Sequence, residues 1–152
     1  MEKEKTIEAL NALIIINNDR IEGYKTASKE TEEPDLKTLF AQFISTSQKC
    51  KQELILEVSK LGGKAAEGTM TSGKFFRVWM DVKAALTGKD RKAILNSCEY
   101  GEDNALDTYE DVLVNDCEHL SEEQQTMINV QKSLLKAGHD HIRALRESLV
   151  DA

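Results

Sequence analysis

Four polar side chains in this sequence could together accept hydrogen bonds or hold a cation, because each interrupts an otherwise apolar stripe. Asn17, Ser47 and Glu102 lie three or four positions from apolar neighbours on three different segments, and Gln131 lies close to the stripe of a fourth. A polar group that is buried without a hydrogen-bond partner costs about 1 to 3 kcal/mol. We therefore expect these side chains to find partners on facing segments.

A carboxylate-bridged di-iron centre is the most demanding chemistry that such a set could support. It needs about four acidic residues and two histidines, with Glu-x-x-His on two of its helices. No Glu-x-x-His occurs in the sequence, and the second segment carries Ser47-x-x-Cys50 instead. Glu102 is the one acidic residue near the centre of an apolar stripe. The sequence therefore argues against a complete di-iron centre.

The favoured interpretation is a buried hydrogen-bond network in which amides and hydroxyls hold a single carboxylate. Its expected members are Asn17, Ser47, Glu102, Gln131 and either Tyr24 or Tyr109. Such a network costs stability relative to an apolar core, but it specifies how the helices align. It requires no cofactor.

The alternative is a single iron or manganese ion held by acidic residues and a histidine. The candidate ligands are Glu22, Glu99, Glu102 and His141. Glu22 and Glu99 lie off their stripes, and His141 lies about two turns from the middle of its segment. His139 is expected to face water. The alternative is therefore the weaker of the two.

Long amphipathic segments must position these residues. Apolar residues recur at spacings of three and four, the period of an α-helix. The segments cover residues 2–31, 34–62, 90–117 and 121–149. Pro34, the Gly62-Gly63 pair and the capping-box pattern of Ser121 and Gln124 mark where helices begin or end. Four helices with one apolar face each predict an all-α fold, a four-helix bundle.

The connection between the second and third segments is long enough to run back along such a bundle. It contains a linker of small residues at 64–71 and a short helix expected at residues 73–86. At the rise of helical and extended chain, these residues can cover the length of a long helix. We therefore favour an up-down-down-up order with one crossover over a simple up-down-up-down order.

The composition indicates one soluble domain, residues 1–152, because 152 residues suffice for a single core. A net charge of -7 disfavours nucleic acid as a partner. The first residues contain no apolar signal core, and no apolar stretch approaches the ~20 residues that span a membrane, so we expect a cytoplasmic protein without a signal peptide. Three widely spaced cysteines form no disulfide framework, and Cys50 and Cys98 should pack as small hydrophobes.

Short motifs are distributed along nearly the whole chain. They read Ile-Asn-Asn-Asp-Arg-Ile-Glu-Gly-Tyr at 16–24, Trp-x-x-x-Lys-Ala-Ala-Leu at 79–86, Cys-Glu-x-Gly-Glu-Asp at 98–103 and His-Asp-x-Ile-Arg-x-Leu at 139–145. With these motifs the chain resembles a family of small bacterial ferritin-like four-helix-bundle proteins of unknown function. The resemblance implies a ferritin-like bundle and no known activity. The ligand pattern of the wider ferritin-like group, which includes iron oxidases and iron stores, finds Glu102 and Glu22 and fails at Ser47 and Cys50.

These observations favour a non-enzymatic protein over an enzyme. We expect a bacterial stress-related or interaction protein that forms a homo-oligomer, such as a dimer. The alternative function is an iron- or manganese-binding protein or oxidase that uses Glu102 and its neighbours.

Overall fold

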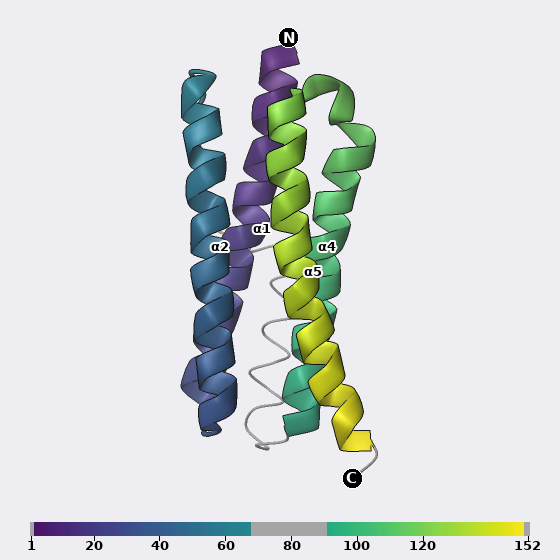
Figure 1. Cartoon of the computed structure of the whole chain (residues 1–152). Coiled ribbons are helices and arrows are strands. Elements are labelled where there is room, and N and C mark those ends of the chain that lie inside the picture. Colours follow the sequence, from purple (N-terminus) through teal and green to yellow (C-terminus); the bar gives the residue numbers. More distant parts are fainter. Residues whose placement is uncertain (1, 68–90, 151–152) are drawn as a thin grey trace.

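The described part of the chain, residues 2–67 and 91–150 of the computed structural model, is helical and contains no strand. Its helices are α1 (Glu2–Glu30), α2 (Pro34–Lys60), α4 (Arg91–Asn115) and α5 (Glu122–Val150), with a short 3-10 helix, η1, at Cys117–His119. The four long helices stand side by side (Figure 1). The all-α bundle is as predicted, and the helix expected at residues 73–86 lies outside the described residues. No described helix is long and apolar enough to cross a lipid bilayer.

Local sequence signals determine where the helices begin and end. Pro34 is the first residue of α2, where its missing N–H is not needed. Beyond the end of α2, Gly62 has a φ of 76°, a left-handed conformation that glycine adopts at little cost. Before α5, the N–H of Gln124 donates to Ser121 Oγ at 3.0 Å and the N–H of Ser121 donates to Gln124 Oε1 at 2.9 Å. The predicted helix stop and the predicted capping box are confirmed.

Helices α2 and α4 run in the same direction. Arg91, the first residue of α4, donates through Nη2 to Asp35 Oδ2 at 2.8 Å and through Nη1 to Glu33 Oε2 at 3.0 Å, so the starts of the two helices lie together. Helices α1 and α5 run the opposite way (Figure 1). The order is therefore up-down-down-up with one crossover, because the simple order would bring the start of α4 to the end of α2.

The chain that leaves α2 turns back along α1. Asn11 donates through Nδ2 to the carbonyl of Lys64 at 3.1 Å, and its Oδ1 accepts the N–H of Ala66 at 2.8 Å. At Gly63, an added Cβ would lie 2.6 Å from Ile7 Cδ1. A side chain at this position would require the Ile7 side chain or the returning backbone to shift.

The buried faces of α2 and α4 follow the predicted stripes. In α2 the buried residues are Leu36, Leu39, Phe40, Phe43, Ser47, Cys50, Leu54 and Val58. In α4 they are Ile94, Leu95, Cys98, Gly101, Glu102, Ala105, Tyr109 and Val112. Their spacings of three and four residues place each set on one side of its helix.

Helices α1 and α5 depart from the predicted pattern. In α1 the consecutive residues 16–21 are all buried, so the prediction of a single buried face is wrong for this helix. In α5, the apolar repeat of Met127, Val130 and Leu134 predicts that Val130 and Leu134 lie in the core, but their exposed fractions are 55% and 41%. Ile128 and Gln131 take the inward positions instead. The exposed set and the buried set on α5 both have helical spacing. Packing against the other helices decides which of the two sets faces the core.

Candidate functional site

The four predicted polar residues are all fully buried, with exposed fractions of 0%. They belong to two neighbouring layers of hydrogen bonds across the bundle. The ion-pair layer consists of Arg20, Tyr24, Ser47 and Glu102, and the amide layer consists of Asn17, Tyr109 and Gln131. The layers lie about one helical turn apart, because Asn17 precedes Arg20 by three residues on α1.

In the ion-pair layer, Arg20 and Glu102 form a salt bridge in the middle of the core. Arg20 donates to Glu102 Oε1 through Nε at 2.9 Å, and its Nη2 lies 2.7 Å from the same oxygen. The hydroxyl of Tyr24 also donates to this oxygen. Arg20 Nη1 donates to Ser47 Oγ at 2.6 Å. Helices α1, α2 and α4 are thus joined through one guanidinium group.

Aromatic rings and the backbone of α5 enclose this guanidinium. The Arg20 Cζ atom lies 5.4 Å from the ring centroid of Tyr24 and 5.5 Å from that of Phe43. At Gly138 on α5, an added Cβ would lie 3.2 Å from Phe43 Cε1 and 3.3 Å from Arg20 Nη2. Such close approach leaves little room for a larger side chain at Gly138. The ring faces favour the cation electrostatically, because their quadrupoles are negative.

Burial and charge shift the titration of these groups. Burial alone lowers the pKa of Arg20, but interactions with Glu102, and then with Tyr24 and Tyr109, outweigh it, so this pKa lies above its ordinary value. Burial first and the charge of Glu102 second hold the pKa of Tyr24 well above its usual range. Arg20 therefore stays a cation and Tyr24 stays a hydroxyl donor at neutral pH.

In the amide layer, two amides meet at one tyrosine hydroxyl. Asn17 Nδ2 donates to the Tyr109 oxygen at 2.8 Å, and the Tyr109 hydroxyl donates to Gln131 Oε1 at 2.7 Å. Gln131 Nε2 in turn donates to the backbone carbonyl of Cys50 at 3.2 Å and to Glu53 Oε1 at 3.0 Å. This chain links α1, α4, α5 and α2. Burial raises the pKa of Tyr109, so its hydroxyl keeps its proton.

The pairing within the core differs from the predicted pairing. Asn17 and Gln131 were expected to hold Glu102, but both bind Tyr109, and Arg20 holds the carboxylate instead. Arg20 was not among the predicted members of the network. A signal for it exists, because a second stripe on α1 has helical spacing and all its members are buried: Leu10, Leu13, Asn17, Arg20, Tyr24 and Ala27.

Two acceptors in these layers remain without a hydrogen-bond partner among the described residues. They are Glu102 Oε2 and Asn17 Oδ1. Leaving a buried acceptor unpaired costs about 1 to 3 kcal/mol. The layers therefore contribute less to stability than a fully satisfied network would.

The cysteines of the core are packing residues. Cys50 and Cys98 are free thiols with exposed fractions of 0%, as predicted. Burial first, with the charge of Glu53 next, raises the pKa of the Cys50 thiol to about 11. Burial also raises the pKa of Cys98. A thiolate is the nucleophilic and metal-binding form, so neither residue has a reactive thiol at neutral pH.

The predicted metal ligands are not brought together. Glu102 is bound to Arg20 in the core, whereas the Glu22 side chain is 61% exposed and pairs with Lys25. His141 is exposed and lines a groove between α2 and α5. The four candidates Glu22, Glu99, Glu102 and His141 thus form no common site, because they lie on different faces of their helices.

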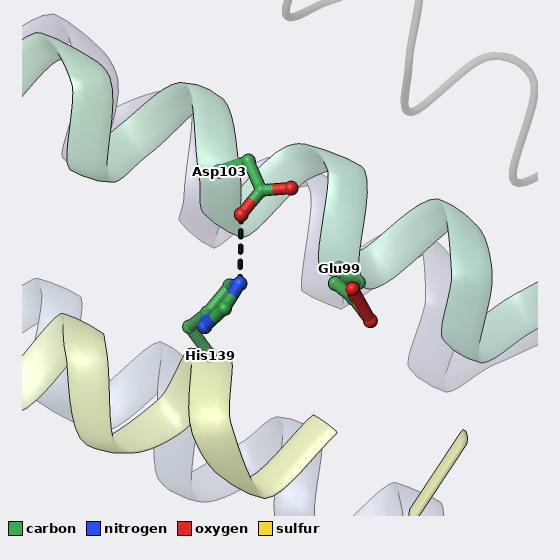
Figure 2. A group of neighbouring side chains, drawn as sticks. All are labelled: Glu99, Asp103 and His139. Atoms are coloured by element: carbon green, nitrogen blue, oxygen red, sulfur yellow. Dashed lines mark ion pairs between the residues drawn. The ribbon is translucent and has the colours of Figure 1, made fainter. Parts of the chain in front are cut away.

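A different cluster lies near the surface between α4 and α5. Glu99, Asp103 and His139 each offer one ligand atom, and these atoms lie within 4.8 Å of one another. Figure 2 shows Glu99 and Asp103 on neighbouring turns of α4, with His139 facing them from α5. The His139 side chain is only 13% exposed, so the expectation that it faces water is wrong. Packing of α5 against α4 covers it.

The chain matches a known protein family in sequence and a solved structure in fold. The family described as Domain of unknown function (DUF2383) matches residues 5–115. A solved structure of a conserved hypothetical protein, rv2844, from Mycobacterium tuberculosis is similar to 97% of this chain and 94% of that chain, with a TM-score of 0.75 and 15% sequence identity. At this identity the likeness shows the fold alone. No curated protein matches the chain. Because the matched residues make up most of its length, the chain belongs to the family of domains of unknown function DUF2383.

Proposed function

We propose that this protein is a ferritin-like bundle over residues 1–152 in which a buried ion pair replaces a metal centre, and that it acts as a non-enzymatic interaction protein. The helix order supports the ferritin-like assignment. Ferritin-like folds have one long crossover connection, as the parallel α2 and α4 require here. The function then depends on the surface of the bundle.

The position of Arg20 is the observation that carries this proposal. Its side chain is 1% exposed, and both guanidinium contacts with Glu102 are made in the middle of the core. A cation about 4 Å from this group would be repelled by about 4 kcal/mol per unit charge at an effective dielectric of 20. A divalent ion at Glu102 would therefore have to displace Arg20, and this argues against iron or manganese in the core.

The rate of iron oxidation tests whether the protein is non-enzymatic. We expect the protein to oxidise Fe²⁺ in air no faster than buffer does, because Glu102 is already neutralised by Arg20. The ferric absorbance and the oxygen uptake of the wild type should equal those of Glu102→Gln. Faster oxidation by the wild type that Glu102→Gln abolishes would contradict the proposal. His139→Ala is the control, since it changes the surface cluster and leaves the core unchanged.

An apolar ridge supports the interaction part of the proposal. It consists of Met127, Val130 and Leu134 on α5, with Leu56 nearby on α2. Leu56 is 58% exposed, Val130 55% and Leu134 41%. The hydrogen bond from Gln131 to Glu53 shows that these parts of α5 and α2 are adjacent. Exposed apolar patches of this kind are typical of protein interaction sites.

A second copy of the chain is the proposed occupant of this apolar ridge. We expect light scattering to give at least twice the 17.1 kDa of one chain, because burying the ridge removes apolar surface from water. The double variant Val130→Lys, Leu134→Lys should have the mass of a single chain, with helix content unchanged. Val114→Lys is the control, because Val114 is 62% exposed in the last turn of α4 and is not part of the ridge. A monomeric wild type at high concentration would contradict self-association.

A further inference from the structure

The cluster between α4 and α5 has the geometry of a small metal site. Glu99 and Asp103 are four residues apart on α4, so both project from the same side of the helix. His139 faces them from α5, with its Nε2 atom 2.7 Å from Asp103 Oδ1 (Figure 2). One ligand atom from each residue lies within 4.8 Å of the others. Ligand atoms that share one ion with bonds of about 2.0 to 2.2 Å lie within such distances.

We propose that Glu99, Asp103 and His139 bind one divalent transition-metal ion at this place, which we call the α4–α5 site. The ion would take the place of the direct contact between His139 Nε2 and Asp103 Oδ1. This inference is independent of the proposed function, because the site lies near the surface and shares no residue with the ion-pair layer. It assigns a ligand to the one part of the described chain where an imidazole and two carboxylates converge.

The orientation of His139 supports metal binding. Its Nδ1 atom lies 3.1 Å from Asp140 Oδ1. A histidine that ligates a metal commonly donates its other ring N–H to a carboxylate, which selects the tautomer and holds the ring in place. With Nδ1 directed to Asp140, Nε2 is the atom that faces Asp103 and Glu99. The His139 ring is therefore already oriented as in a metal-bound histidine.

Arg146 would compete with the ion for the carboxylate of Glu99. It binds both carboxylate oxygens of Glu99, through Nε at 2.6 Å and through Nη2 at 3.2 Å. Its side chain is 24% exposed, so it can turn outward into solvent. Asp103 is 53% exposed, which gives an ion access from water and leaves room for water ligands. When a metal ion binds at this site, its positive charge would thus replace that of Arg146 beside Glu99.

The donor set favours a first-row transition metal over magnesium or calcium. Magnesium and calcium prefer shells made of oxygen alone, whereas imidazole suits zinc, iron and similar ions. Two carboxylates and one imidazole, completed by water, fit Zn²⁺ in particular. We therefore choose Zn²⁺ as the probe and Mg²⁺ as the negative control.

Calorimetric titration of the metal-free full chain with Zn²⁺ tests the proposal. All samples carry Cys117→Ser, because the exposed Cys117 thiol would bind zinc itself. We expect one equivalent to bind, with affinity reduced at least about tenfold in His139→Ala and no binding of Mg²⁺. His141→Ala is the matched control, because His141 is exposed two residues further along α5 and should bind as tightly as the parent.

A pair of charge variants separates a metal site from a simple ion-pair network. Arg146→Gln releases Glu99 and should tighten zinc binding about twofold to fivefold, the range expected when a partly exposed ion pair no longer competes. Glu99→Gln should weaken binding. Glu102→Gln should leave it unchanged, which distinguishes this site from the core. The inference is overturned if zinc does not saturate near one equivalent, if His139→Ala binds like His141→Ala, or if Arg146→Gln weakens binding. Circular dichroism of each variant shows whether it is folded.

Discussion

Replacing Arg20 with methionine is expected to lower the free energy of unfolding by about 3 to 5 kcal/mol. The variant leaves the buried carboxylate of Glu102 without the cation that neutralises it, and Tyr24 remains its only donor among the described residues. It also removes the donor to Ser47 Oγ. Breaking a buried ion pair by removing one partner has this large cost because an uncompensated charge stays in a medium of low polarity. Urea denaturation, followed by circular dichroism, measures the loss.

A double-mutant cycle identifies the cause of that loss. Glu102→Leu should also destabilise the protein, since it leaves the guanidinium of Arg20 buried and unpaired. The double variant Arg20→Met, Glu102→Leu should regain most of the lost stability, because replacing a whole buried pair with apolar residues of similar volume is often neutral. Additive losses in the double variant would contradict the ion-pair explanation.

A surface pair provides the control for the cycle. Arg143 and Glu147 form an ion pair with both side chains 57% exposed, and exposed helical pairs are worth about 0.5 kcal/mol or less. Arg143→Met should therefore leave the denaturation midpoint nearly unchanged. If Arg20→Met behaved like Arg143→Met, the guanidinium of Arg20 would be in contact with water.

Removing the hydroxyl of Tyr109 is expected to have the second large effect on stability. Tyr109→Phe should lower the free energy of unfolding by about 1 to 3 kcal/mol. The amide group of Asn17 keeps the Leu13 carbonyl as an acceptor but loses the Tyr109 oxygen, and Gln131 Oε1 loses its donor, while the ring keeps its packing. Both amides are fully buried, so water does not replace the lost partner without a structural change. Thermal and urea denaturation measure the effect.

The same substitution on the surface of α4 is the control for Tyr109. Tyr100 is 46% exposed, so Tyr100→Phe removes a hydroxyl that water already solvates. We expect its stability to equal that of the wild type. Equal stability of Tyr109→Phe and Tyr100→Phe would show that the amide layer makes no net contribution.

The helices and their ends follow from the local sequence. Apolar residues at spacings of three and four, together with the capping signals, predicted α1, α2, α4 and α5 to within two residues of every boundary. Pro34, Gly62 and Ser121 act through their own backbone and side-chain chemistry, which depends on near neighbours in the chain. For the same reason Ser47 and Glu102 were recognisable as core positions, since each interrupts a regular apolar stripe on its own helix.

Which polar groups pair in the core was decided by the tertiary structure. Periodicity gives the direction of a side chain around its own helix, at steps of about 100° per residue. It does not give the rotation or the axial offset of one helix relative to another. Arg20 was therefore not predicted as a core residue, although it lies on a stripe with Asn17 and Tyr24. The sequence alone does not show that Arg20 reaches Glu102 across the bundle.

The sequence by itself determined an all-α bundle with polar residues in the middle of its core, and it contains no Glu-x-x-His motif. The tertiary structure decided that a guanidinium neutralises Glu102, that α5 turns Val130 and Leu134 outward, and that His139 faces Glu99 and Asp103. The physical reason is the range of the interactions. Helix formation depends on contacts within four residues, whereas these three features depend on how whole helices are rotated when their side chains pack.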